Sequence, residues 1–137
     1  MMRLRKMLLL FGAAVMLMSP VCKAEDMQFV DADGNTGYYV DVDSLVFEEA
    51  TLVNARVAVK KAAMNRMFLY TMQFDAGMRT YRTIESQIIQ YDTKKVLETK
   101  MGSEVAHPYS EMSPMNSIVA YIYEWTAHRK KVQRPDA

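Results

Sequence analysis

Apolar and polar residues alternate through the middle of the chain, as they do in strands that bury one face. Residues 52–60 place Val53, Ala55, Val57 and Val59 on one side, and residues 66–74 repeat the pattern with larger apolar side chains. Clusters of Gly, Asn, Asp and Lys separate such runs and predict turns. The expected strands are residues 27–30, 38–40, 45–47, 52–60, 66–74, 79–91 and 96–100.

Two local signals refine this picture. The Gly- and Asn-containing residues 31–37 predict a hairpin between the first two strands, because these residue types fit tight turns. In the long segment 79–91, the apolar alternation slips between Ile84, Ile88 and Ile89, which predicts a β-bulge.

The pattern changes to a helical period near the end of the chain. Ser113 is a suitable N-cap and Pro114 a suitable first helical residue. The helix is expected to run to Lys131, with cations in its last turn facing the negative end of the helix dipole, and residues 132–137 are expected to form a frayed tail. Its apolar side recurs at Met115, Ile118, Val119, Ile122 and Trp125.

Together these elements predict an α+β fold. Consecutive antiparallel strands form a five- to six-stranded meander with one apolar face, and the C-terminal helix covers that face. We expect residues 25–137 to form a single domain, since about 110 residues are enough to bury a core.

The first 24 residues have the order of a secretory signal peptide. Arg3, Arg5 and Lys6 precede the apolar run 7–18, and a small-residue step ends at Ala24, the expected cleavage point. The run has twelve residues, short of the roughly 18–20 that span a bilayer, so it is not expected to be a transmembrane helix. No transmembrane helix is expected in the chain that remains after its removal. We therefore predict an exported protein, periplasmic or at the cell surface. Lipidation at Cys22 is the less favoured alternative, because Ser19-Pro20-Val21 match the usual lipidation signal poorly.

Charge and cysteine content narrow the function. The chain has a net charge of +1, but removal of residues 1–24 leaves 13 basic and 16 acidic residues, a net charge of −3. This balance argues against a nucleic-acid-binding protein. Cys22 is the only cysteine, so the mature chain has no disulfide and no thiol chemistry. No cofactor is expected.

No catalytic or metal-binding motif stands out. Asp31, Asp33 and Asn35 resemble the start of a calcium loop but lack its Gly and Glu, so a hairpin turn is the better interpretation. His107 and His128 have no metal-ligand spacing, and no nucleophile-elbow motif occurs. Carboxylates such as Asp41, Asp43 and Asp75 could still converge in a hydrolase site.

Tyrosines and a basic cluster are the candidates for partner binding. Eight tyrosines are many for this length, and tyrosine suits both interfaces and half-buried strands. The basic helix end suits a polyanion or the helix dipole alone. The residues predicted to bind a partner are Tyr38, Tyr39, Arg79, Tyr81, Arg82, Arg129, Lys130 and Lys131.

Short motifs in the chain resemble those of the surface-adhesin protein E family. Residues 37–41, GYYVD, followed by Ser44 resemble its "YYVD..S" signature, and residues 79–82, RTYR, resemble its "R.YR" strand entry. Ser113-Pro114 resembles the start of its closing segment. The family's two cysteines are both missing, one at Ala76 and one near Trp125, and Met27 or Phe29 stands in for an early Trp. The resemblance implies an exported envelope domain that binds host or matrix proteins in some members.

We therefore expect a non-enzymatic, exported binding module with a host, matrix or envelope protein, or a polyanion, as its partner. Two alternatives remain open. One is a small periplasmic hydrolase that uses Asp or Glu. The other is a self-assembling structural envelope protein, in which the long segment 79–91 pairs edge to edge across a homodimer.

Overall fold

The computed structural model describes residues 25–133. The predicted signal peptide and lipidation site, residues 1–24, and the end of the predicted tail, residues 134–137, lie outside the described residues. The elements in chain order are β1 (Met27–Asp33), β2 (Thr36–Glu49), β3 (Leu52–Lys61), the short 3₁₀ helix η2 (Ala62–Met64), β4 (Arg66–Asp75), β5 (Thr80–Gln90), β6 (Val96–Met101), β7 (His107–Pro108) and α2 (Pro114–Gln133).

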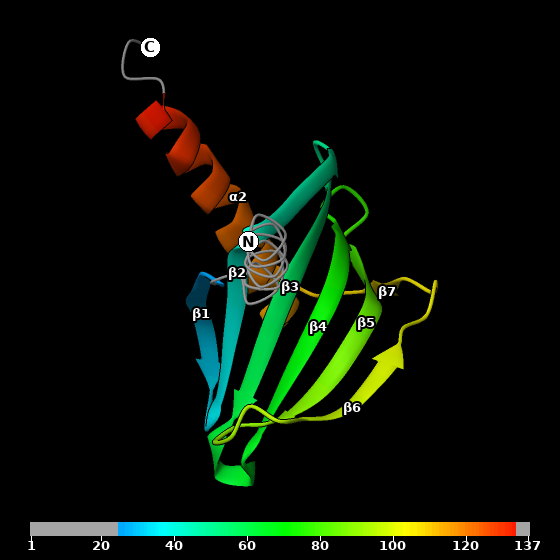
Figure 1. The fold of residues 1–137 in the computed structure, drawn as a ribbon. Helices are drawn as coiled ribbons and strands as arrows, with labels where there is room; N and C mark the ends of the chain where they lie inside the picture. The colour runs from blue at the N-terminus through cyan, green and yellow to red at the C-terminus, as the bar shows by residue number, and fades with distance from the viewer. Residues whose placement is uncertain (1–24, 134–137) are drawn as a thin grey trace, which may run out of the picture.

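The strands form one open antiparallel sheet in the order β1-β2-β3-β4-β5-β6, so that each strand pairs with the next one along the chain (Figure 1). The expected meander and single C-terminal helix are confirmed. The first hairpin turns at Gly34-Asn35, and Gly34 has a positive φ of 59°, which glycine adopts without strain. The sequence did not indicate β7, which pairs with the start of β5.

The sequence predicted separate strands at residues 38–40 and 45–47, with a break at Asp43-Ser44 between them, and this break is wrong. β2 is a continuous 14-residue strand, and its pairing with β3 shifts register between Asp41 and Val46. The polar residues occupy this bulge instead of ending the strand. Asp41 and Ser44 stabilise the bulge with side-chain hydrogen bonds, which are described below.

The bulge predicted in the long segment is confirmed, but the segment does not lie at an edge of the sheet, as its expected edge-to-edge pairing requires. Register shifts occur where β5 pairs with β4 near Thr83 and where it pairs with β6 near Ile88. β5 is an interior strand, with β4 on one side and β6 and β7 on the other. It therefore has no long free edge for pairing with a second copy. β1 lies at one free edge of the sheet, and β6 and the short β7 lie at the other.

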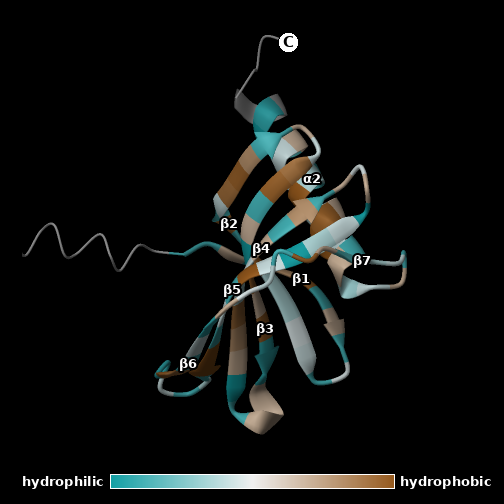
Figure 2. Cartoon of the chain, turned by 90° about the vertical axis from the view of Figure 1, so that its right-hand side faces the viewer, coloured by the Kyte–Doolittle hydropathy of each residue, from teal (hydrophilic) through white to brown (hydrophobic). Residues whose placement is uncertain are grey.

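α2 packs on one side of the sheet, behind β2 in Figure 1, and the turned view of Figure 2 shows the same arrangement. Its N-cap is as expected, because the Ser113 hydroxyl accepts the backbone N–H of Met115 at 3.2 Å. Ile118 and Ile122 are fully buried, and they lie against Val40, Val53 and Phe74 of the sheet. The helix extends to Gln133, two residues beyond the predicted end.

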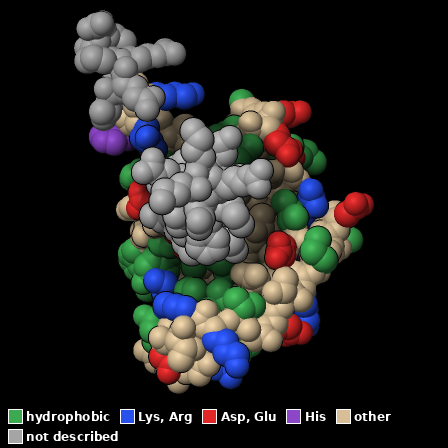
Figure 3. Space-filling model, in the orientation of Figure 1, with side chains coloured by type: hydrophobic (Ala, Val, Ile, Leu, Met, Phe, Trp, Pro, Cys, Tyr) green, Lys and Arg blue, Asp and Glu red, His purple; other side chains and the backbone are tan. Residues whose placement is uncertain are grey.

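The helix covers only part of that face. Its backbone lies closest to β1 and β2, and Ser117 and Tyr121 donate hydrogen bonds to Asp31 and Gln28 of β1. The opposite face has a smaller cluster around Ala58, Leu69 and Ile89. Figure 3 shows hydrophobic side chains of this opposite face gathered over β1 and β2.

Candidate functional site

A groove of about 540 Å³ lies on the helix-bearing face of the sheet, where α2 begins and leaves the strands uncovered. Met115, in the first turn of α2, forms one side of it. This volume falls within the range of small-molecule and side-chain binding sites, which are mostly apolar with a few polar groups. The groove is lined by Tyr38, Val59, Lys61, Phe68, Tyr70, Met72, Tyr81, Thr83 and Met115.

Strand register explains why these side chains meet. Tyr38 is opposite Val59, which is opposite Phe68, so one row crosses β2, β3 and β4. Side chains two residues apart on a strand share a face, which adds Tyr70 beside Phe68. These two rings stack at 6.4 Å with an interplanar angle of 11°. The groove therefore presents a row of aromatic surfaces.

The polar groups of the groove are the Lys61 ammonium and the hydroxyls of Thr83 and the lining tyrosines. Among the described lining residues, Lys61 is the one that carries a charge, and its ammonium lies 5.7 Å from the Phe68 ring centre. Burial raises the pKa of Tyr70 above its ordinary value of 10.0, and the neighbouring Tyr38 raises it further. Tyr70 thus keeps its phenolic proton at neutral pH and is able to donate a hydrogen bond to an acceptor in the groove.

Two of the eight predicted binding residues meet in this groove. Tyr38 and Tyr81 both line it, from β2 and β5. Tyr39 and Arg82 lie on the opposite face. There Tyr39 contacts Phe29 edge-to-face at 5.5 Å and has the Lys60 ammonium over its ring at 4.2 Å. The Arg82 guanidinium donates to Gln73 at 2.9 Å on the same side.

The other predicted residues lie away from the groove. Arg79 is in the β4–β5 turn, where its guanidinium is 3.7 Å from the Glu111 carboxylate. Arg129 and Lys130 are exposed near the end of α2, and Lys131 follows them in the helix, with its side chain outside the described part. The predicted set is therefore divided among two sheet faces, a turn and a helix end.

A second groove of about 530 Å³ lies between the β2–β3 turn and the last part of α2. Phe47 and Tyr123 meet edge-to-face there at 5.7 Å, and the Tyr123 hydroxyl donates to the Ala50 carbonyl at 2.8 Å. Lys130 lines this groove, but so does Glu49 of opposite charge. Its lining is thus less aromatic than that of the first groove, and its charges offset each other.

Phe68, Tyr70 and Lys61 line the main groove but were not among the predicted binding residues. Their alternation did predict that Phe68, Tyr70, Met72 and Phe74 share one face. Phe74 is fully buried beneath α2, whereas Phe68 and Tyr70 remain half-buried in the groove. The alternation indicates a common face but not how far the helix extends over it.

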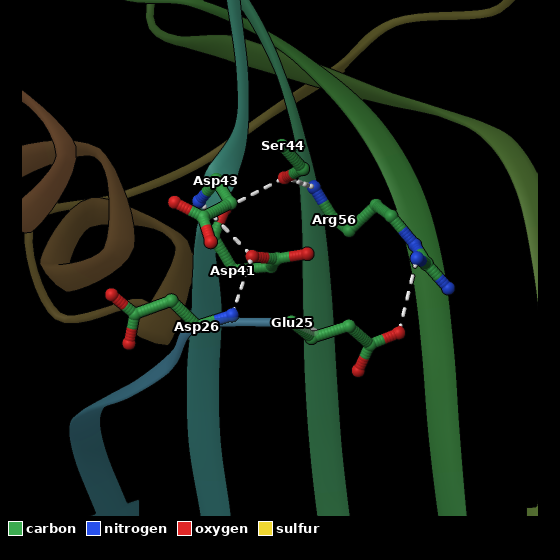
Figure 4. Close-up of polar contacts among 6 residues, drawn as sticks. All are labelled: Glu25, Asp26, Asp41, Asp43, Ser44 and Arg56. Atoms are coloured by element: carbon green, nitrogen blue, oxygen red, sulfur yellow. Dashed lines mark hydrogen bonds and ion pairs between the residues drawn. The ribbon is translucent and has the colours of Figure 1, made fainter. Parts of the chain in front are cut away.

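Asp41, Asp43 and Ser44 form a polar network at the β2 bulge (Figure 4). The Asp41 carboxylate is almost fully buried and accepts the backbone N–H groups of Asp26 at 3.1 Å and Asp43 at 3.0 Å. The Ser44 hydroxyl donates to the Asp41 carbonyl at 2.6 Å. These contacts hold backbone in place, which is the role of a structural carboxylate.

Asp75, the third acid considered for a hydrolase site, lies apart from this network. It ends β4, where its carboxylate accepts the Met78 backbone N–H at 2.9 Å. Thr71 of β4 lies in the row of Asp41, so Asp75 is four residues further along and two strands away. His107 is exposed beside the Tyr81 ring, and His128 is exposed on α2. Within residues 25–133, no three His, Cys, Asp or Glu side chains gather in a way that suits a metal ion.

Comparison of the chain with protein-family models, curated proteins and solved structures finds no match. In the described part of the chain, no helix combines the length and the apolar character needed to cross a membrane.

Proposed function

We propose that this protein is an exported, non-enzymatic α+β binding module that engages a protein partner through the aromatic groove. The observation that carries the proposal is the lining of the groove by Tyr38, Phe68, Tyr70 and Tyr81. Aromatic side chains bury a large area with little conformational freedom to lose, and they dominate the energetics of protein interfaces. The export pattern of residues 1–24 and the resemblance to surface-adhesin protein E point to a host, matrix or envelope protein as the partner.

The charge of the groove indicates which side chains a partner segment would carry. Lys61 is the charged residue of the described lining, and the Tyr70 hydroxyl stays protonated. Both groups donate hydrogen bonds, so they suit an acceptor such as a carboxylate. The fitting segment is a surface loop with an aromatic or aliphatic side chain next to Asp or Glu.

The test compares binding of groove variants to immobilised matrix and envelope proteins by biolayer interferometry. Tyr70→Ala and Lys61→Glu are expected to weaken binding by about tenfold or more, the usual effect of removing an interface anchor. Phe29→Ala is the matched control, because Phe29 is an aromatic residue 55% exposed on the opposite face. It is expected to bind as the unchanged protein does. Equal binding by all three variants, or no binding partner in the set, would contradict the proposal.

The basic end of α2 offers a second candidate function, polyanion binding. Arg129 and Lys130 are adjacent, exposed cations near the helix end, and Lys131 follows them. Heparin-affinity chromatography measures this directly. A double substitution, Arg129→Ser with Lys130→Ser, is expected to lower the eluting salt concentration if the helix end binds polyanions. An unchanged elution position would leave the helix dipole as the reason for these cations.

A further inference from the structure

β6 is the free edge of the sheet opposite β1. It pairs with β5 on one side only, and all six of its residues are exposed (Figure 1, right). An edge strand leaves backbone N–H and C=O groups unpaired in the plane of the sheet, and a further strand can pair with them. Leu97 and Met101 are also 43% and 79% exposed on this strand. The edge thus combines free backbone groups with uncovered apolar surface.

The backbone alternation identifies which residues face outward. Gly102, directly after β6, donates its backbone N–H to the Ile84 carbonyl at 2.8 Å. Ser86 pairs with Lys100 in the same register. Backbone groups of successive strand residues point to alternate sides of the strand. The backbone N–H and C=O of Lys100 therefore point to β5, and those of Thr99 and Met101 point to the free side. A strand added there would form its central hydrogen-bonded pair at Thr99.

The sequence of β6 is complementary to itself around Thr99. In an antiparallel pair centred on that residue, Thr99 lies opposite Thr99 of the second copy. Glu98 lies opposite Lys100 in both directions, and Met101 lies opposite Leu97, the residue of β6 that has no partner on β5 at the bulge. Opposite charges, paired threonines and paired apolar residues are the cross-strand combinations that stabilise a sheet. Many edge strands use charges to repel a second copy, but here the two charges attract it.

We propose that the protein forms a two-fold symmetric dimer by antiparallel pairing of β6 with β6 of a second copy. The two sheets join into one, with both α2 helices on the same side because opposite residues of paired strands share a face. Within one chain, Lys100 and Glu98 already lie 3.4 Å apart, with 66% and 46% of their side chains exposed. An exposed pair of this kind contributes little by itself, so both charges remain available to the second copy.

The experiment measures the molar mass of the purified protein, expressed from its full coding sequence, by light scattering and sedimentation over a wide concentration range. The expected result is a monomer–dimer equilibrium. Lys100→Glu and Glu98→Lys each replace two attractive cross-strand pairs with two repulsive ones, and each is expected to weaken dimerisation by about tenfold or more. The exchange variant Glu98→Lys with Lys100→Glu restores the opposite pairs and the net charge, and it is expected to recover the dimer.

Three results would overturn this inference. The first is a monomer at every concentration. The second is a dimer whose dissociation constant does not change with Lys100→Glu. The third is an assembly that grows without limit, which indicates head-to-tail pairing of β6 with β1. Circular dichroism of each variant verifies that the exposed substitutions leave the fold intact. The groove variants Tyr70→Ala and Lys61→Glu are expected to dimerise normally, so the two proposals fail independently.

Discussion

The hydroxyl of Ser44 on β2 accepts the backbone N–H of Arg56 on β3 at 2.8 Å. This bond lies inside the bulge, where the regular pairing of the two strands is interrupted. The same hydroxyl donates to the Asp41 carbonyl, so one side chain satisfies a backbone group on each strand. A polar residue that looks like a strand break in the sequence therefore keeps β2 continuous.

Ser44→Ala is expected to destabilise the protein by about 1–3 kcal/mol, because it leaves the half-buried Arg56 N–H without its acceptor. Urea denaturation measures the change in the free energy of unfolding. Ser110→Ala, at an exposed loop position, is the matched control and is expected to change it by less than about 0.5 kcal/mol. Equal stability of both variants would show that the Ser44 bond has no net value.

Gly102→Ala is expected to cost about 1–3 kcal/mol or more, since a Cβ at this position would overlap the Thr83 backbone carbonyl. A backbone carbonyl inside the sheet cannot move aside as a flexible side chain can. Gly77→Ala is the control, because its nearest neighbour, the Asp75 carboxylate, lies at an ordinary 3.4 Å. Thermal unfolding of both variants compares the two positions. A normal melting temperature for Gly102→Ala would mean that the Thr83 carbonyl leaves room for a Cβ at this position.

Ile122→Ala is expected to destabilise the protein by about 2–5 kcal/mol, because Ile122 is fully buried between α2 and the sheet. The single Trp125 reports on the same contact, since it packs against this core and stacks on Tyr121 at 6.3 Å. Its fluorescence is expected to shift towards that of exposed Trp at lower urea concentrations than in the unchanged protein. The exposed Glu124→Ala is the control on the same helix.

Stability is expected to fall as the pH rises above about 10, the ordinary tyrosine pKa. Burial raises the pKa of Tyr70, Tyr109, Tyr121 and Tyr123 in the folded protein. The unfolded chain therefore releases these protons first. The stabilisation is fully present below the unfolded pKa and is lost as the pH rises through the folded values.

The alkaline loss is measured by urea denaturation at a series of pH values, together with the ultraviolet absorbance of tyrosinate. Tyr70→Phe removes one ionising group, so it is expected to show a smaller loss of stability above pH 10 than the unchanged protein. An identical pH dependence of the two proteins would contradict the assignment of part of the effect to Tyr70.

The sequence predicted the features that depend on local pattern. Alternation at residues 52–60 indicated a strand, and Ser113-Pro114 indicated the start of the helix, because burial of one face and capping both depend on a few neighbouring residues. The bulge in β2 was missed, since Asp41 and Ser44 act through partners on β3 and at Asp26. Both residues stabilise the fold through hydrogen bonds with the backbone.

The groove could be predicted only in part. Tyr38 and Tyr81 were chosen by residue type, and Phe68 and Tyr70 were placed on the right face. Where the groove opens depends on where α2 crosses the sheet, and this crossing is fixed by contacts such as Tyr121 with Gln28, 93 residues apart. Neither periodicity nor composition predicts a contact between residues so far apart in the sequence.

The position of α2 in the chain also determines when the core forms during synthesis. The sheet is complete before this helix emerges, yet Val40, Val53 and Phe74 are covered only when Ile118 and Ile122 dock on them. Until residues 114–133 have been made, the nascent chain has an uncovered apolar sheet face and cannot reach its final packing.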